Sequence, residues 1–432
     1  MTPFRLMATA PFLHDENAPA QARLFASFTN LLVALVGLLI ACAPFYLRQG
    51  CAAGSKVVHL LTGISYNPFI STALGAGAIL YLLVHRRSHR ELTLVLMLTS
   101  LLAAVYGVAG VGAAFWVGAP FLMGGGVLGI ACIGTCLLVR DTRSLILTAA
   151  FPVCMTITAV FLGAMVRFHP TTFDPTLFRF DQSLGGQISF WMGRLLAAST
   201  PLRNTAFLAY IMLPVAPAFA YLFERRLRVD GVLVQFLTLG AVGSIAINLL
   251  PAAGPKFAFA AFPVFPALGD LPSAARMMLP LAPRNAIPSL HMSWALLLFW
   301  HSRPYPRWAR SVFALLVALT VMATLGLGEH YVVDLVVAFP FTLALRSAFA
   351  RKAAATVVCV STVAAWLILL GTGALTNHPS LVLSWLLVIG TVGGSCWAEH
   401  RLFCIPANTA NEDPCHQQLT DDEPSYAGVA AA

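Results

Sequence analysis

The stretch SVFALLVALTVMATLGLG, residues 311–328, contains no charged side chain, and a second apolar run, residues 331–345, follows after only two residues. Eighteen helical residues rise about 27 Å, close to the thickness of the hydrocarbon core of a bilayer. The stretch is therefore expected to cross a membrane. Of all 432 residues, 59% are hydrophobic and 10% are charged, whereas about 25% are charged in soluble proteins. This composition excludes a water-soluble protein.

Similar apolar runs recur along the chain and predict an all-α, polytopic transmembrane helical bundle of about 12 spans. The expected spans are residues 25–47, 67–84, 92–117, 120–139, 144–166, 204–223, 231–250, 287–300, 311–328, 331–345, 353–375 and 381–396. Glycines in the fourth span, at positions 124–126 and 129, are expected to allow close helix packing.

The basic residues predict the orientation of this bundle. With the N-terminus inside, seventeen of the 26 Lys and Arg fall on the cytoplasmic side, in accord with the positive-inside rule. They are Arg5, Arg23, Arg86, Arg87, Arg90, Arg140, Arg143, Arg225, Arg226, Arg228, Arg303, Arg307, Arg310, Arg346, Arg351, Lys352 and Arg401. This pattern explains the net charge of +9 without a nucleic-acid partner. We expect a multi-pass protein of a bacterial inner membrane with both termini in the cytoplasm.

Seven of the other nine basic residues fall in two long segments, residues 167–203 and 251–286, both expected on the non-cytoplasmic side. The first contains the apolar stretch 188–198, which predicts a helix lying in the membrane interface. The second contains seven prolines and is not expected to form regular helix.

Cysteine usage indicates neither a disulfide framework nor a metal site. The nine cysteines are scattered, with no CxxC pair and no zinc-type spacing to histidine. We therefore expect no cofactor and no metal.

Ionisable residues at membrane depth are costly and mark candidate functional sites. Two short sequences attract notice: Asn-Ala-Ile-Pro-Ser-Leu-His at residues 285–291 and Gly-Glu-His-Tyr-Val-Val-Asp at residues 328–334. Each is expected at the outer end of a span, beneath the proline-rich segment that carries Lys256 and Arg284. Isolated histidines are usually interfacial polar residues, as we expect for the four at positions 59, 169, 301 and 378.

The two short sequences together contain the groups that phosphoryl transfer needs. Pro288 at a first helical position, followed by Ser289, predicts a helix N-terminus that favours an anion, with His291 in its first turn. His330 and Asp334 are spaced i, i+4 and are expected to share a helix face. The carboxylate could then accept the Nδ1 proton, leaving Nε2 as a nucleophile or base. A second histidine as proton donor completes a phosphohistidine mechanism.

Pro288-Ser289-Leu290-His291 and His330-Tyr331-Val332-Val333-Asp334-Leu335 resemble the second and third signature motifs of the type 2 phosphatidic acid phosphatase (PAP2) superfamily. The wording is most similar to its branch related to inositol phosphorylceramide synthases. The resemblance implies that His330 is the nucleophile, Asp334 its orienting partner, and His291 the general acid that protonates the leaving oxygen. It covers roughly residues 167–349.

The sequence departs from the superfamily at its phosphate-binding arginines. Lys256 can open the first motif, Lys-x6-Arg-Pro, but Pro263 occupies the position of the arginine. Ala323 and Thr324 replace the Ser-Arg that precedes the third-motif histidine, and Leu290 replaces the glycine of the second motif. The phosphate is therefore expected to be held by Lys256 and Arg284 together with Ser289 and Leu290 of the second motif.

The resemblance also divides the chain. Residues 1–24 form a cytoplasmic tail, 25–166 an accessory five-helix membrane region, and 167–350 the PAP2-like catalytic core. Two further transmembrane helices occupy residues 351–404, and residues 405–432 form a disordered cytoplasmic tail.

The predicted activity is that of a lipid phosphatase or phosphotransferase acting on a lipid-linked phosphate at the periplasmic face. Attack by water would give hydrolysis, and attack by a hydroxyl would give head-group transfer, which the branch resemblance slightly favours. The alternative is a twelve-span proton-coupled transporter that uses His330 and Asp334 as a relay. A transporter would require internal repeats and a midplane site, and neither is visible. The lipid, the acceptor and the oligomeric state are left open.

Overall fold

The computed structural model describes residues 30, 32–41, 68–84, 87–108, 119–227, 231–266, 276–279, 282–377 and 380–403. Most of these residues are helical, and within the described ranges the only strands are β1 (Thr171–Thr172) and β2 (Met277–Met278), which pair antiparallel. The predicted all-α class is therefore confirmed. The two predicted terminal tails lie outside the described residues.

Eight helical stretches of the described chain are long and apolar enough to cross a membrane. They are α5 (His89–Val108), α6 (Ala119–Val139), α7 (Thr142–Phe168), α10 (Thr200–Met212) continued through η1 (Leu213–Val215) into α11 (Ala216–Leu227), α15 (Arg307–Gly326), α16 (Val332–Phe349), α17 (Ala353–Gly371) and α19 (Leu381–Phe403). The predicted membrane bundle is supported, whereas the count of about 12 spans is not confirmed.

Three of the other expected spans are helices of fewer than 18 residues. These are α4 (Pro68–Val84) with 17 residues, α12 (Val232–Ala246) with 15, and α14 (Leu290–His301) with 12. Twelve helical residues rise only about 18 Å, little more than half of a hydrocarbon core. The one remaining expected span, residues 25–47, is described only in part.

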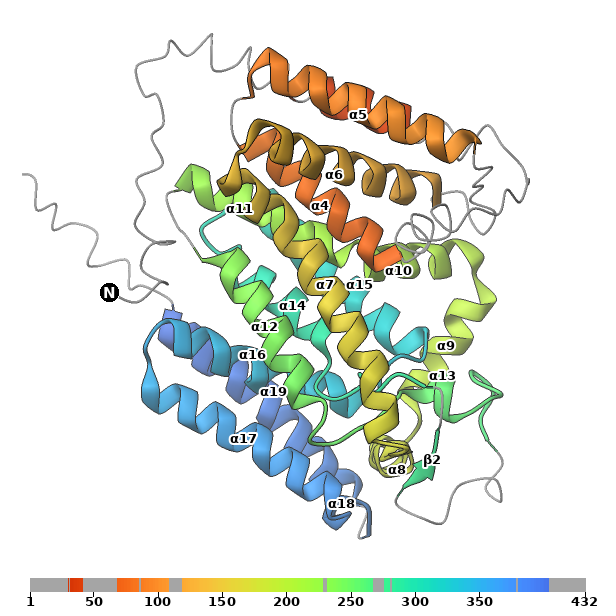
Figure 1. The fold of residues 1–432 in the computed structure, drawn as a ribbon. Helices are drawn as coiled ribbons and strands as arrows, with labels where there is room; N and C mark the ends of the chain where they lie inside the picture. The colour runs from red at the N-terminus through yellow and green to blue at the C-terminus, as the bar shows by residue number, and fades with distance from the viewer. Residues whose placement is uncertain are drawn as a thin grey trace, which may run out of the picture.

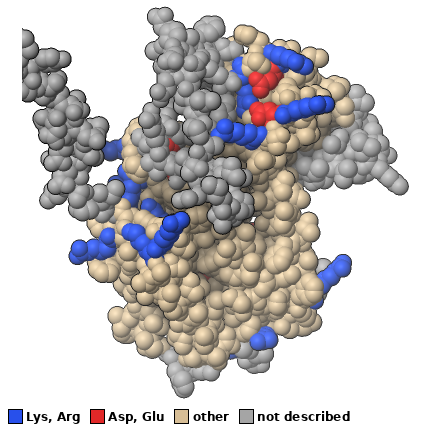
Figure 2. Space-filling model, turned by 60° about the vertical axis from the view of Figure 1, so that its left-hand side comes forward, with Lys and Arg blue, Asp and Glu red and all other residues tan. Residues whose placement is uncertain are grey.

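The helices alternate in direction, so that α11 and α16 end, and α12 and α17 begin, on the same side of the molecule, at the left of Figure 1. The space-filling view, with that side turned forward, shows Lys and Arg in separate groups bordering a broad surface without charged side chains (Figure 2). This distribution is compatible with the positive-inside pattern, and the assignment of that side to the cytoplasm stays a prediction.

The two long segments lie together at the lower right of the bundle, where α8 (Asp174–Ser183), α9 (Ile188–Ala198) and β2 are seen in Figure 1. The bounds of α9 coincide with the apolar stretch for which a helix was predicted. In the described part of the proline-rich segment, the four-residue helix α13 (Pro255–Ala258) and the two-residue strand β2 interrupt the otherwise irregular backbone. Pairing of β1 with β2 joins the two segments.

The first predicted spans pack against the second half of the bundle through α4. This helix contacts α6 and α7, and it also contacts α10, η1 and α11 of the second half. Glycines permit the close approach of α4 to α7 and α6. A Cβ at Gly77 would overlap the carbonyl oxygen of Thr148 in α7, and one at Gly129 in α6 would overlap that of Leu74. The packing role predicted for the glycines of α6 is confirmed at Gly129.

We predict that Gly77→Ala lowers the free energy of unfolding by about 1–3 kcal/mol, because the added Cβ meets a backbone carbonyl that cannot rotate away. Thermal unfolding in detergent measures the effect. Gly163→Ala is the matched control, since no heavy atom lies within 4 Å of a Cβ there and alanine has the higher helix propensity. Equal melting temperatures for the two variants would contradict the packing argument.

Candidate active site

The two motifs meet where α14 and α16 begin. The ring centroids of His291 and His330 are 6.1 Å apart, with an interplanar angle of 64°. The backbone N–H of Ser289 donates to the carbonyl of Asp334 at 3.2 Å and joins the two helix starts directly. Two imidazoles at this separation can face one small anion between them.

The start of α14 differs in one detail from the expectation. Ser289 is the N-cap residue, and its Oγ accepts from the backbone N–H of Met292 at 3.3 Å. Pro288 therefore precedes the cap and does not occupy the first helical position. The N-terminus remains a place that favours an anion, because its first N–H groups have no intrahelical acceptor.

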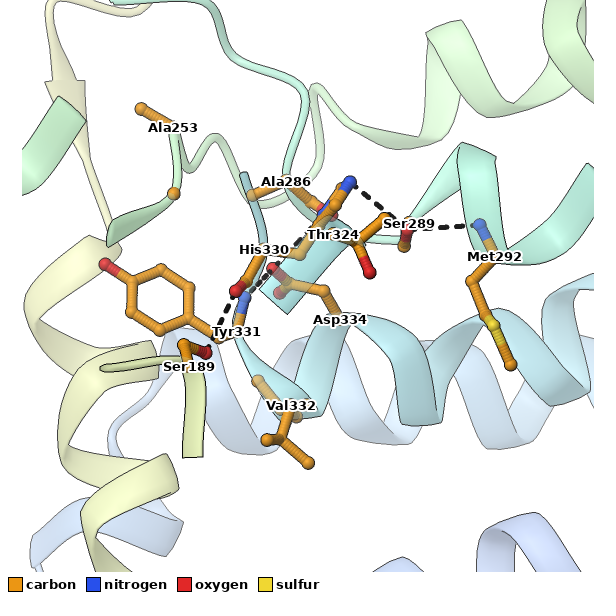
Figure 3. A network of polar contacts seen from close by, with 12 residues as sticks. Ser189, Ala253, Ala286, Ser289, Met292, Thr324, His330, Tyr331, Val332 and Asp334 are labelled. Carbon is orange, nitrogen blue, oxygen red and sulfur yellow. Dashed lines mark hydrogen bonds and ion pairs between the residues drawn. The ribbon is translucent and has the colours of Figure 1, made fainter. Parts of the chain in front are cut away.

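His330 is fully buried and held through both ring nitrogens (Figure 3). Its Nδ1 lies 2.8 Å from the carbonyl oxygen of Ala286, and its Nε2 lies 3.2 Å from Ser289 Oγ. A carbonyl oxygen can only accept, so Nδ1 carries the proton. Nε2 then has a free lone pair, which the Ser289 hydroxyl meets as donor. This is the tautomer that a nucleophilic Nε2 requires.

Asp334 contributes to this arrangement differently from the expectation. Since α16 begins at Val332, His330 precedes the helix and does not share a helix face with Asp334. Asp334 Oδ2 accepts from the backbone N–H of Tyr331 at 2.7 Å and lies 3.5 Å from His330 Nδ1. The carbonyl of Ala286 is thus the nearer acceptor. Within the described structure, the buried Oδ1 of Asp334 has no hydrogen-bond partner.

His291 lies in an aromatic pocket that includes a residue of the accessory region. Its ring stacks on Tyr210 of α10, with centroids 3.9 Å apart and 19° between the planes. Phe69 of α4 lies 5.9 Å from the same ring and 5.6 Å from Tyr210. The first five predicted spans carry none of the motifs. Only the packing of α4 against α10 brings Phe69 here.

Lys256 lies beside the third motif. Its backbone N–H donates to the carbonyl of Gly328 at 3.0 Å, and its ammonium group forms an ion pair with the carboxylate of Glu329. The side chain is 35% exposed, so the cation remains open to solvent. Glu329, adjacent to His330, had been given no role from sequence. An incoming phosphate would compete with this carboxylate for Lys256.

Arg284 is fully buried, and backbone carbonyls surround its guanidinium group. It donates to His169 at 2.8 Å, to Pro170 at 3.4 Å, and to the closer carbonyls of Ala282 and Leu279. These bonds tie the proline-rich segment to the end of α7. They favour a structural role over the expected phosphate contact, because four of its five N–H groups are used.

The side chain of Leu290 is directed into the bundle, where it packs closely on Gly243 of α12. Only the backbone of Leu290 is therefore available to an anion at the start of α14. His301, at the other end of α14, contacts Glu224 and Gln235, in keeping with a merely polar role. His59 and His378 lie outside the described residues. Among the described side chains, no group of three or more His, Cys, Asp or Glu could hold a metal ion.

Comparison with known proteins supports the family seen in the motifs. Residues 175–348 match a family model described as the PAP2 superfamily, and the match contains both short sequences. It indicates a phosphatase-type enzyme with a lipid-phosphate substrate and a membrane environment. The narrower resemblance to inositol phosphorylceramide synthases is not confirmed. No curated protein and no solved structure matches the chain significantly.

The different surroundings of the two candidate phosphate-binding cations lead to opposite expectations for their variants. Arg284→Met should lower the free energy of unfolding by about 2–3 kcal/mol, since buried carbonyls lose their donors, while orthovanadate still raises the melting temperature. Lys256→Met should change stability little and lose most of the vanadate shift. Thermal unfolding with and without orthovanadate measures both. A vanadate shift lost only in Arg284→Met would reverse the assignment.

Proposed function

We propose that this chain is an integral-membrane lipid phosphatase or phosphotransferase that acts through a phosphohistidine intermediate at the non-cytoplasmic face. The observation that carries the proposal is the environment of His330. Its Nδ1 donates its proton to a carbonyl, its Nε2 carries no proton and has the Ser289 hydroxyl as its only hydrogen-bond partner among the described residues, and a second imidazole lies 6.1 Å away. The match to the PAP2 superfamily supports the same class of reaction.

In the first step, Nε2 of His330 attacks the phosphorus atom, and the bond from phosphorus to the lipid oxygen breaks. Protonated His291 gives its proton to that oxygen, so the lipid leaves as an alcohol. The positive charge that develops on the His330 ring is stabilised through Nδ1 by the Ala286 carbonyl and by the carboxylate of Asp334, 3.5 Å away.

In the second step, neutral His291 takes a proton from the attacking water or hydroxyl, which forms a new bond to phosphorus. The bond from phosphorus to Nε2 breaks, and the electron pair returns to His330. Water yields inorganic phosphate, and a lipid or sugar hydroxyl yields a transferred head group. Both histidines regain their starting states, so the cycle closes without an external acid or base.

Three groups near the paired helix starts are suited to hold the phosphate. Lys256 supplies a partly exposed cation, the Ser289 hydroxyl lies next to Nε2, and the backbone at Leu290 provides the positive end of α14. His291 is partly exposed whereas His330 is fully buried, so substrate would enter from the His291 side. The start of the short helix α14 fixes where this candidate phosphate site lies within the bundle.

The transporter alternative remains less suited to the geometry. Its proposed relay, His330 and Asp334, lies at the start of α16, next to the start of α14. A proton relay would be expected to continue through polar side chains along the bundle. Here the pair is followed along α16 by the apolar residues 335–341.

We expect His330→Ala to abolish turnover, with a fall in kcat of at least about 10³-fold, because the nucleophile is lost. Purified protein in detergent would be assayed with phosphatidic acid and with an isoprenyl diphosphate, with and without an acceptor alcohol, scoring free phosphate and new lipid. His89→Gln, a change at an exposed histidine where α5 begins, is the control. Retained turnover in His330→Ala would refute the nucleophile assignment.

His291→Ala should separate the two steps when the leaving group needs no proton. With an aryl phosphate ester, the variant should release one equivalent of phenol in a burst and then stall as an acid-labile phosphoenzyme. With phosphatidic acid, whose alcohol must be protonated, no burst is expected. Rapid-quench measurement of phenol and protein-bound phosphate tests this, and steady hydrolysis of the aryl ester at the wild-type rate would exclude the role of His291.

A further inference from the structure

Helix α8 carries two fully buried carboxylates that contact the segment following His330. Asp174 and Asp181 are both 0% exposed, and neither belongs to the two motifs. Burying a carboxylate is costly unless it is hydrogen-bonded. Their carboxylate oxygens accept hydrogen bonds from Tyr331, Val332 and Val333 of the third motif, and from the backbone of residues 253 and 254.

Asp181 caps the catalytic helix from a distant part of the chain. Its Oδ2 accepts from the backbone N–H of Val332 at 2.8 Å, and its Oδ1 accepts from Val333 at 3.3 Å. These are the first two N–H groups of α16, which have no acceptor within the helix. A residue 151 positions earlier in the sequence thus fixes where α16 begins, directly after His330 and Tyr331.

Asp174 joins the same loop to the segment that leads to Lys256. Its Oδ1 accepts from the Tyr331 hydroxyl at 3.0 Å and from the N–H of Gly254 at 2.8 Å, while its Oδ2 accepts from Ala253 at 3.0 Å. Gly254 has a φ of +100°, and a Cβ there would overlap the carbonyl of Glu329. The segment can therefore approach the third motif closely only with glycine at this position.

The backbone of His330 itself is bonded on both sides. Its N–H donates to the carbonyl of Thr324 at 3.1 Å, and its carbonyl accepts from Ser189 Oγ of α9 at 3.1 Å. Because Tyr331 and Val332 are hydrogen-bonded to α8, the chain on the C-terminal side of His330 has little freedom. The ring can then keep its Nε2 at one position.

We propose that Asp174 and Asp181 are positioning residues of the active site: their buried carboxylates fix the backbone around His330 and so set the approach of Nε2 to phosphorus. This inference rests on the proposed function. Neither residue would touch the substrate. Burial raises the pKa of the Asp181 carboxyl, and the two N–H donors oppose that rise.

If the two carboxylates only stabilised the fold, their removal would affect stability without affecting the chemical step. This difference allows a test. Glu224 of α11 provides the matched control. It too is a buried carboxylate that accepts from the first N–H of a helix, Val232 of α12 at 3.0 Å, but it contacts His301 at the far end of α14. Asp181→Ala and Glu224→Ala therefore remove the same kind of cap near the site and far from it.

The experiment measures kcat and KM with phosphatidic acid, together with the melting temperature, for full-length protein in detergent. We expect Asp181→Ala to lower kcat by about 100-fold with KM changed less than about threefold, because a small misplacement of a reacting group has an effect of that order. Asp181→Asn, which keeps an acceptor oxygen, should restore most of kcat. Glu224→Ala should lower the melting temperature and leave kcat within about twofold of wild type.

Tyr331→Phe tests the role of Asp174 while its carboxylate stays in place, since only the hydroxyl donor is removed. A several-fold lower kcat at unchanged KM is expected, and it decides the question if Asp181→Ala does not fold. An active wild type with unchanged kcat in both Tyr331→Phe and the folded Asp181 variants would overturn the positioning role alone. A wild type that turns over no lipid phosphate would overturn the proposed function and the inference together.

Discussion

The hydrogen bond from His330 Nδ1 to the carbonyl of Ala286 is the interaction on which the site depends. It selects the tautomer that leaves Nε2 without a proton. It also links His330, two residues before α16, to the segment before α14. The bond can form only because both helices begin at the same place. The cap at Ser289 and the carboxylate of Asp181 set those two beginnings. Reactivity at one nitrogen atom thus depends on where two helices start.

The accessory helices contribute more than a membrane anchor. Through the glycine contacts of α4, they place Phe69 next to Tyr210, on whose ring His291 stacks. These aromatic contacts favour one orientation of the His291 imidazole. A residue of the predicted accessory region therefore lies beside His291, although the family match begins only at residue 175.

Much of the fold could be predicted from sequence, because apolar run length is a local signal. The helix over residues 188–198 and the glycine packing of α6 were predicted for the same reason. The two motifs were expected to lie close together, and the rings of His291 and His330 are 6.1 Å apart. The count of about 12 spans is not confirmed, since hydropathy does not distinguish a crossing helix from a short one such as α14. Arg284 was assigned to phosphate from its charge and proximity, but four backbone carbonyls surround it in the fold.

By itself, the sequence determined an all-helical bundle of membrane type and the two motifs that resemble the PAP2 superfamily. Both follow from composition and from spacing over a few residues. The tertiary structure alone decided the partners: Ala286 as the nearest acceptor for His330, Glu329 opposite Lys256, and the carboxylates of α8 at the start of α16. These contacts join residues far apart in the chain. A hydrogen bond requires a donor–acceptor distance that is correct to within a few tenths of an ångström, and only the packed bundle fixes such distances.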